Sequence, residues 1–108
     1  MISFDDIIKV LSKMNIPYAY HHFVADETNP LPTPPFIIYY ADNNDSFFAD
    51  NKNYCNFNHF VIELVTEKKD IELESKLEAL FFNANIPFDK EGDDYIENER
   101  IYQVRYSV

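Results

Sequence analysis

Residues 54–87 read YCNFNHFVIELVTEKKDIELESKLEALFFNANIP, and this stretch decides the fold. Its first part, Tyr54 to Thr66, is rich in β-branched and aromatic residues and predicts the longest strand of the chain. Successive residues of a strand point to opposite faces, which places Phe60, Ile62 and Leu64 on one face and Val61 and Val65 on the other. We therefore expect both faces of this strand to be partly covered.

A helix is predicted directly after this strand. Asp70 is placed to cap its first turn, and the Asn-Ile-Pro segment at 85–87 ends it, because Asn tolerates the left-handed conformation and Pro cannot continue a helix. Between these signals the apolar residues form one helical stripe, which consists of Leu73, Leu77, Leu80, Phe81 and Ala84. The pattern predicts an amphipathic helix that packs on a sheet.

The amino-terminal part repeats this corner between a helix and a strand. Ser3 and Asp6 resemble a capping box, and a second Asn-Ile-Pro segment at 15–17 ends the helix. Its apolar stripe is Phe4, Ile7, Ile8, Leu11 and Met14. Tyr18 to Val24 is then predicted as a strand. Ala25 to Pro35 contains four prolines and reads as an extended connector, with a proline-rich ligand for a recognition domain as the alternative.

The other segments supply further strands. Phe36 to Tyr40 predicts a short buried strand, and residues 46–54 a small hairpin with its turn at 50–53. After the second helix, two short strand segments, 88–90 and 95–97, flank a polar turn through Gly92. Ile101 to Val108 alternates apolar and polar residues with the clearest period of two, so we expect one side of this last strand to face the core.

The order of these elements is α-β-β-β-β-α-β-β. It predicts one α+β domain over residues 1–108, with a mostly antiparallel sheet of about four main strands, a small hairpin and two helices packed on the sheet. The length of 108 residues, 46% of them hydrophobic, suffices for one core and leaves no room for a second domain.

The net charge of −10, from 19 acidic against 9 basic residues, argues against sequence-independent binding to nucleic acid or to anionic membranes. The acidity keeps a surface soluble, or else faces a basic partner or lines a passage. No apolar run is long enough to span a membrane, and the amino terminus has no signal peptide pattern. The single cysteine, Cys55, forms no internal disulfide and fits a reducing cytoplasm.

Metal and phosphate sites are not expected. His21 and His22 are adjacent in a predicted strand and so point to opposite faces, while Cys55 and His59 would lie about 13 Å apart along one face. Gly92 is the only glycine, which excludes the glycine-rich loops that hold phosphates. We therefore expect no metal and no cofactor.

Catalytic motifs are not recognised either. No nucleophile elbow or similar signature occurs, and the acidic residues near the carboxyl end read as solvated side chains of a polar turn. These residues are Glu91, Asp93, Asp94, Glu97 and Glu99. The sequence favours a protein that is not an enzyme, and a small enzyme that uses these carboxylates remains a third alternative.

The segment from Asp45 to Leu80 carries a resemblance to a known group of proteins. The recognisable parts are Phe47-Phe48-Ala49-Asp50 with Lys52 and Tyr54, then Ile62-Glu63-Leu64 with Thr66, Lys69-Asp70 and Leu73-Glu74. In these parts the chain resembles tail-completion proteins, small proteins encoded between head and tail genes in prophages of low-GC Gram-positive bacteria. The opening helix that ends in a Pro and the loop with several prolines before Phe36 are similar to that group as well.

The resemblance implies a structural role in the virion. Tail-terminator and head-to-tail joining proteins form a homohexameric ring at the tail end nearest the head, so the implied partners are copies of this chain, the tail-tube protein and the head connector. The implied location is the tail or neck of the virion, after assembly in the cytoplasm of the host bacterium. Candidate contacts to other subunits or partners are Phe47, Phe48, Asp50, Lys52 and Tyr54.

A binding module of another class is the alternative function. An acidic domain can occupy the basic groove of a DNA-binding protein, and such a module would be a monomer or dimer whose complex weakens with salt.

Overall fold

The stretch that decides the fold forms the predicted strand and helix. In the computed structural model of the chain, which describes residues 3–24, 31–41 and 59–108, β3 (Phe60–Thr66) leads into α2 (Ile71–Asn83). Before them come α1 (Phe4–Ser12), β1 (Tyr18–Tyr20) and β2 (Phe36–Ala41), and after them β4 (Asp89–Ile96) and β5 (Ile101–Ser107). The order α-β-β-β-α-β-β confirms the α+β fold class.

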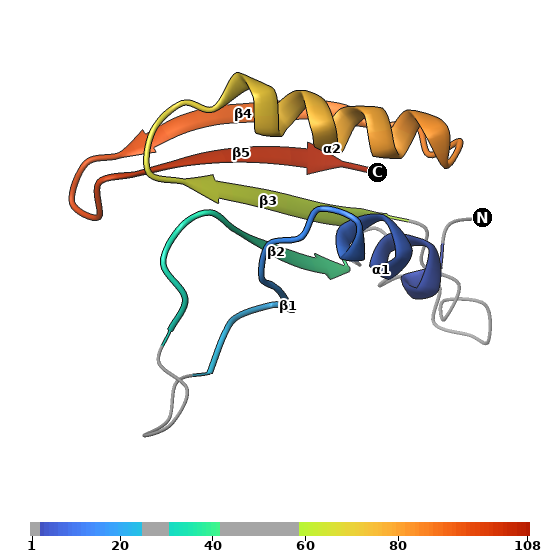
Figure 1. Cartoon of the computed structure of the whole chain (residues 1–108), viewed down its shortest axis with the longest axis horizontal. Helices are drawn as coiled ribbons and strands as arrows, with labels where there is room; N and C mark the ends of the chain where they lie inside the picture. The colour runs from blue at the N-terminus through green and yellow to red at the C-terminus, as the bar shows by residue number, and fades with distance from the viewer. Residues whose placement is uncertain (1–2, 25–30, 42–58) are drawn as a thin grey trace, which may run out of the picture.

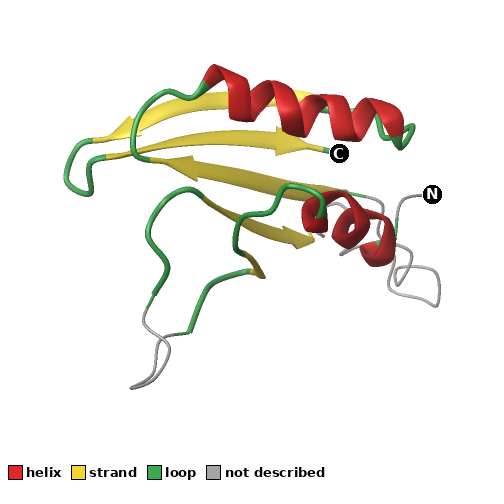
Figure 2. Ribbon diagram, viewed as in Figure 1, coloured by secondary structure: helices red, strands yellow, loops and turns green. Residues whose placement is uncertain are grey.

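The five strands form one mixed, mostly antiparallel sheet. Their order is β1-β2-β3-β5-β4, in which only the pairing of β1 with β2 is parallel (Figures 1 and 2). β3 is the central strand and pairs with β2 on one side and with β5 on the other, so that Leu64 lies between Ile37 and Val104. The sheet therefore depends on pairing between segments far apart in the sequence.

Both helices cover the same face of the sheet and bury one core against it. The two rows of strand residues that meet the helices are Ile37, Leu64 and Val104, and Tyr39, Ile62 and Tyr106. Against these rows α1 packs Ile7 and Leu11, and α2 packs Leu77 and Phe81. Each such side chain, when fully buried, contributes roughly 1.5–3 kcal/mol to the stability of the fold.

The helix ends confirm the predicted signals. The Ser3 hydroxyl accepts a hydrogen bond from the Asp6 N–H, and the Asp6 carboxylate accepts one from the Ser3 N–H, which completes the capping box. Asn15 and Asn85 adopt positive φ angles of 61° and 59° after the two helices. At α2 the Ile86 N–H donates to the Phe81 carbonyl, which is the bond of a Schellman motif.

Two predictions about the strands are wrong. β1 ends at Tyr20, whereas a strand as far as Val24 was expected. The polar turn through Gly92 does not exist, because residues 89–96 form one continuous strand with a β-bulge between Lys90 and Gly92, and the turn lies at 97–100. A bulge accommodates a glycine inside a strand, which is why Gly92 misled the prediction. The small hairpin predicted at 46–54 lies outside the described residues.

Candidate functional site

The five predicted contact residues, Phe47, Phe48, Asp50, Lys52 and Tyr54, lie outside the described residues. The segment that contains them leaves the sheet after Ala41, at the end of β2, and rejoins it at His59, before β3. Ala41 pairs with Phe60 in the sheet, so both attachment points lie at the same end of the sheet. The described surface at this end of the sheet contains a further candidate for contacts with other proteins.

An exposed apolar patch lies at this end of the sheet, formed by Phe4 and Ile8 of α1 and Tyr20 of β1. Their exposed fractions are 44%, 36% and 46%. The Phe4 ring centre is 5.5 Å from that of Tyr20 and 4.9 Å from that of Phe60, both in edge-to-face arrangements. We call Phe4, Ile8 and Tyr20 the α1 patch. Exposed aromatic and aliphatic groups gathered in this way are typical of protein–protein contacts.

The sequence assigned part of this patch to the core. Its predicted stripe included Phe4 and Ile8 beside Ile7, Leu11 and Met14, of which the last three are buried. Val10 is buried as well, so the buried face of α1 is rotated away from Phe4 and Ile8. An apolar stripe wider than one helix face was the available signal that some of these residues stay on the surface.

On the face of the sheet opposite the helices, polar side chains from neighbouring strands interact with one another. The Glu63 carboxylate of β3 accepts a hydrogen bond of 3.4 Å from the Tyr40 hydroxyl and lies 3.5 Å from the Arg105 Nε atom. Val61 and Val65, on the same face of β3, are nevertheless buried, which confirms that both faces of this strand are covered. The Arg105 side chain is 47% exposed, so this face presents charge to its surroundings.

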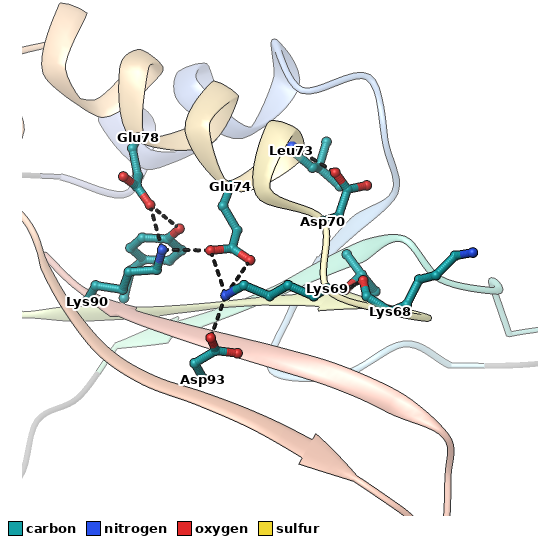
Figure 3. A network of polar contacts seen from close by, with 10 residues as sticks. Lys68, Lys69, Asp70, Leu73, Glu74, Glu78, Lys90 and Asp93 are labelled. Atoms are coloured by element: carbon teal, nitrogen blue, oxygen red, sulfur yellow. Dashed lines mark hydrogen bonds and ion pairs between the residues drawn. The ribbon is translucent and has the colours of Figure 1, made fainter.

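A network of ion pairs joins α2 to β4, as Figure 3 shows. Its centre is Glu74 on α2, whose carboxylate lies 2.6 Å from the Lys90 Nζ atom and 3.0 Å from the Lys69 Nζ atom. Lys69 also pairs with Asp93 on β4, and Lys90 lies 3.1 Å from the Glu78 carboxylate. Glu74, which is not part of the predicted apolar stripe, is only 3% exposed, so its charged group is buried beside two lysines.

The contacts of this network raise the pKa of its two lysines and of Tyr106. The bond to Asp93, with a further bond to Glu74, raises the pKa of Lys69, and the bonds to Glu74 and Glu78 raise the pKa of Lys90. Burial raises the pKa of Tyr106, whose hydroxyl donates a 2.7 Å hydrogen bond to Glu78. A lysine held in its charged form cannot act as a general base or nucleophile, so the arrangement suits a structural clamp.

The carboxylates that the sequence offered for catalysis lie on β4 and in the turn that follows it. Asp93 pairs with Lys69 and is thereby committed to the network, while Glu91 and Asp94 are exposed on the end strand β4. Glu97 and Glu99 lie in the following turn. The strand thus presents an acidic edge, with Asp89 at its beginning.

A serine and a histidine meet at the end of β5. The Ser107 hydroxyl lies 2.6 Å from the Nε2 atom of His59, beside a hollow of about 270 Å³. The hollow is lined by His59, Pro87, Phe88, Asp89, Ser107 and Val108. Nucleophilic catalysis needs, besides such a pair, a third group that orients the imidazole and donors for an oxyanion. The contact ties β5 to the start of β3.

His21 and His22 lie together, against expectation. Their Nδ1 atoms are 3.0 Å apart, whereas adjacent residues of a strand would point to opposite faces. The expectation failed because β1 ends at Tyr20 and His21 has a φ of 70°, which turns the backbone. Neither imidazole was therefore placed correctly from the sequence.

Comparison of the chain with protein-family models, with curated proteins and with solved structures gave no match. Within residues 3–24, 31–41 and 59–108, no three metal-binding side chains gather into one group. Neither helix of this described part has the length and apolar character needed to cross a bilayer.

Proposed function

We propose that the chain is a structural assembly protein of a long-tailed phage or prophage, which completes the tail or joins it to the head as a homo-oligomeric ring. The resemblance of residues 45–80 to tail-completion proteins supports the phage assignment. In this role the protein contacts the tail-tube and head-connector proteins, is assembled in the host cytoplasm and ends in the tail or neck of the virion. It catalyses no reaction.

The observation that carries the proposal is the α1 patch. Phe4, Ile8 and Tyr20 expose apolar surface at the end of the sheet from which the segment with Phe47 and Phe48 departs. Interfaces between subunits are enriched in aromatic residues, and a group of exposed aromatic side chains is therefore a candidate interface. We infer that the patch takes part in the contact between subunits, at the end of the sheet where the attachment residues Ala41 and His59 lie.

The sheet offers a second element of assembly. β1 and β4 are its two end strands, and the end strands of a sheet can pair with strands of other chains. A head-to-tail contact between two different surfaces of one subunit closes into a ring when the rotation allows it. The acidic edge of β4, if it lines the ring, repels DNA phosphates and lets a genome pass without binding.

Stoichiometry tests this proposal. We expect size-exclusion chromatography with light scattering, and negative-stain images, to show rings of six copies, either alone or after addition of the tail-tube protein. A monomer under both conditions contradicts the ring. A gene position between the head-connector and major tail genes is an independent expectation.

The acidic edge of β4 favours a second candidate function. Asp89, Glu91 and Asp94 are exposed along one strand, as in a module that occupies the basic groove of a DNA-binding protein. This candidate predicts a monomer or dimer that forms a complex with such a protein and loses affinity as salt is raised. A ring whose formation does not depend on a basic partner excludes it.

A further inference from the structure

The backbone turns sharply after β1. The His22 N–H donates a 2.7 Å hydrogen bond to the Tyr20 carbonyl across His21, whose φ is 70°. A bond between residues i and i+2 around a positive φ is a γ-turn of the rare, strained form. The His21 N–H donates in addition to the Tyr39 carbonyl at 2.8 Å, so the turn is held against β2.

The turn brings two imidazole nitrogens together. The Nδ1 atoms of His21 and His22 are 3.0 Å apart, and the rings meet edge to face with centroids separated by 5.2 Å. The His21 ring also lies 6.5 Å from the ring of Tyr20 and 6.3 Å from that of Tyr40. Both histidines are exposed, so an ion in solution can reach them.

This separation of 3.0 Å fits two ligands of one transition-metal ion. With metal–nitrogen bonds of about 2.0–2.1 Å, neighbouring ligands lie roughly 2.9 Å apart in square-planar geometry and about 3.3–3.4 Å apart in tetrahedral geometry. The observed distance falls between these values. Nitrogen atoms that already face each other at this distance need little movement to bind an ion.

The protonation of the pair is compatible with such an ion. A hydrogen bond between two Nδ1 atoms requires that one ring carries its proton on Nδ1 and that the other accepts. When a metal ion enters, that proton moves to Nε2 of the same ring, both rings stay neutral, and both Nδ1 lone pairs face the ion. Neutral imidazole is the commonest protein ligand of transition metals.

We propose that His21 and His22 form a binding site for one divalent transition-metal ion of the class that imidazole favours, Zn²⁺, Ni²⁺ or Cu²⁺. In the described part of the chain no third metal-binding side chain joins the pair, and this part leaves the remaining coordination positions open to water. The ion is therefore exchangeable. It fixes the γ-turn that ends β1. This inference does not depend on the proposed function.

Calorimetric titration with Ni²⁺ and with Zn²⁺ tests the site. The parent protein is untagged and carries Cys55→Ser, so that the only thiol does not compete for the ion. We expect one ion per chain, an affinity at least tenfold weaker in His21→Gln and in His22→Gln, and an unchanged affinity in His59→Gln. His59 is the one other histidine of the chain and serves as the matched control. Both histidines of the pair are exposed, so their variants keep the fold.

Three calorimetric results overturn the proposal: a parent protein that binds neither ion, pair variants that bind as tightly as the parent, or a His59→Gln variant that loses as much affinity as they do. Long-range ¹H–¹⁵N spectra of the imidazoles identify the ligand atoms. We expect the Nδ1 signals of His21 and His22 to shift with Zn²⁺. Binding through Nε2 contradicts the geometry.

Discussion

Glu74 of α2 and Lys90 of β4 are joined by an ion pair of 2.6 Å that closes the helix onto the end strand of the sheet. The Glu74 carboxylate is buried, whereas the Lys90 side chain stays partly exposed and also contacts Glu78. Lys69 contributes a second cation from the loop before the helix. The buried charge is thus neutralised by two groups that can each reach water.

Removal of both lysines leaves this carboxylate buried without a cation. We expect Lys69→Met with Lys90→Met to lower the free energy of unfolding by about 3 kcal/mol or more, because an unpaired buried charge is strongly destabilising. Urea unfolding followed by circular dichroism measures the change.

The matched control removes the carboxylate instead. In Glu74→Leu, Lys69 keeps Asp93 and Lys90 keeps Glu78, so no buried charge is left unpaired. We expect a smaller loss, about 1–2 kcal/mol. A Glu74→Leu variant less stable than the double lysine variant contradicts the role assigned to the lysines.

Stability should fall at alkaline pH. The pKa values of Tyr106, Lys69 and Lys90 are all raised in the folded state, Tyr106 by burial and the lysines by their hydrogen bonds to carboxylates. A group with a raised pKa contributes stability that is complete below its unfolded pKa and is lost as the pH rises through the folded one. We therefore expect urea midpoints to stay constant up to about pH 10 and to decrease above it.

Tyr106→Phe tests the largest of these contributions. The variant lacks the hydrogen bond to Glu78 and should be less stable than the parent at pH 8. Because it has no phenol to ionise, the difference in free energy of unfolding should shrink as the pH passes 10. A difference that stays constant up to pH 11 argues against the raised pKa.

Asn85, the residue with left-handed backbone conformation after α2, should tolerate glycine better than alanine. Its φ of 59° is unfavourable for a residue with an ordinary side chain and costs nothing for glycine. Asn85→Ala should lower the free energy of unfolding by about 1 kcal/mol, and Asn85→Gly should leave it nearly unchanged. Equal effects in thermal unfolding contradict a conformational role.

Gly92 should tolerate a side chain. It does not adopt a positive φ, and a Cβ atom there would meet only the Asp94 carboxylate, at an ordinary contact distance of 3.5 Å. We expect Gly92→Ala to leave stability unchanged or to raise it by up to about 1 kcal/mol. A clear loss of stability in chemical unfolding would contradict the expectation that this position does not require glycine.

The α1 patch should be needed for assembly. Ile8→Glu places a charge within it and should abolish or weaken ring formation, with the fold retained because Ile8 lies at the surface. Ser75→Glu adds the same charge at an exposed position of α2 and serves as the control. Light scattering of both variants measures the oligomer. Rings that survive Ile8→Glu argue against this patch as the contact.

The elements of the fold were predictable wherever local signals agreed with one another. Ile71–Asn83 combines clear apolar periodicity with a cap at Asp70 and a stop at 85–87, and it formed as expected. The strand predicted from Tyr54 to Thr66 begins at Phe60 in the described residues, where His59 lies outside it, and residues 54–58 are not described. The strand around Gly92 was not predictable, because a bulge is a property of the pairing with β5 and leaves no local pattern.

The surroundings of individual polar residues were less accessible to prediction. The apolar stripe of the helix did not include Glu74, and the approach of Lys69 and Lys90 from other parts of the chain accompanies its burial. The contact between His21 and His22 depends on one backbone angle, which no sequence pattern specifies. The first feature arises from tertiary contacts and the second from a backbone conformation that has no sequence signal, so sequence patterns could not reveal either.

The central place of β3 affects the order in which the chain can fold. During synthesis β2 and β3 leave the ribosome before β5. Val61 and Leu64 of β3 pair with Ser107 and Val104 of β5, which are among the last residues to be made. Until then one edge of the most hydrophobic strand stays open to other nascent chains. Closing such distant pairs is slow compared with helix formation, so we expect the last strand to set the folding rate.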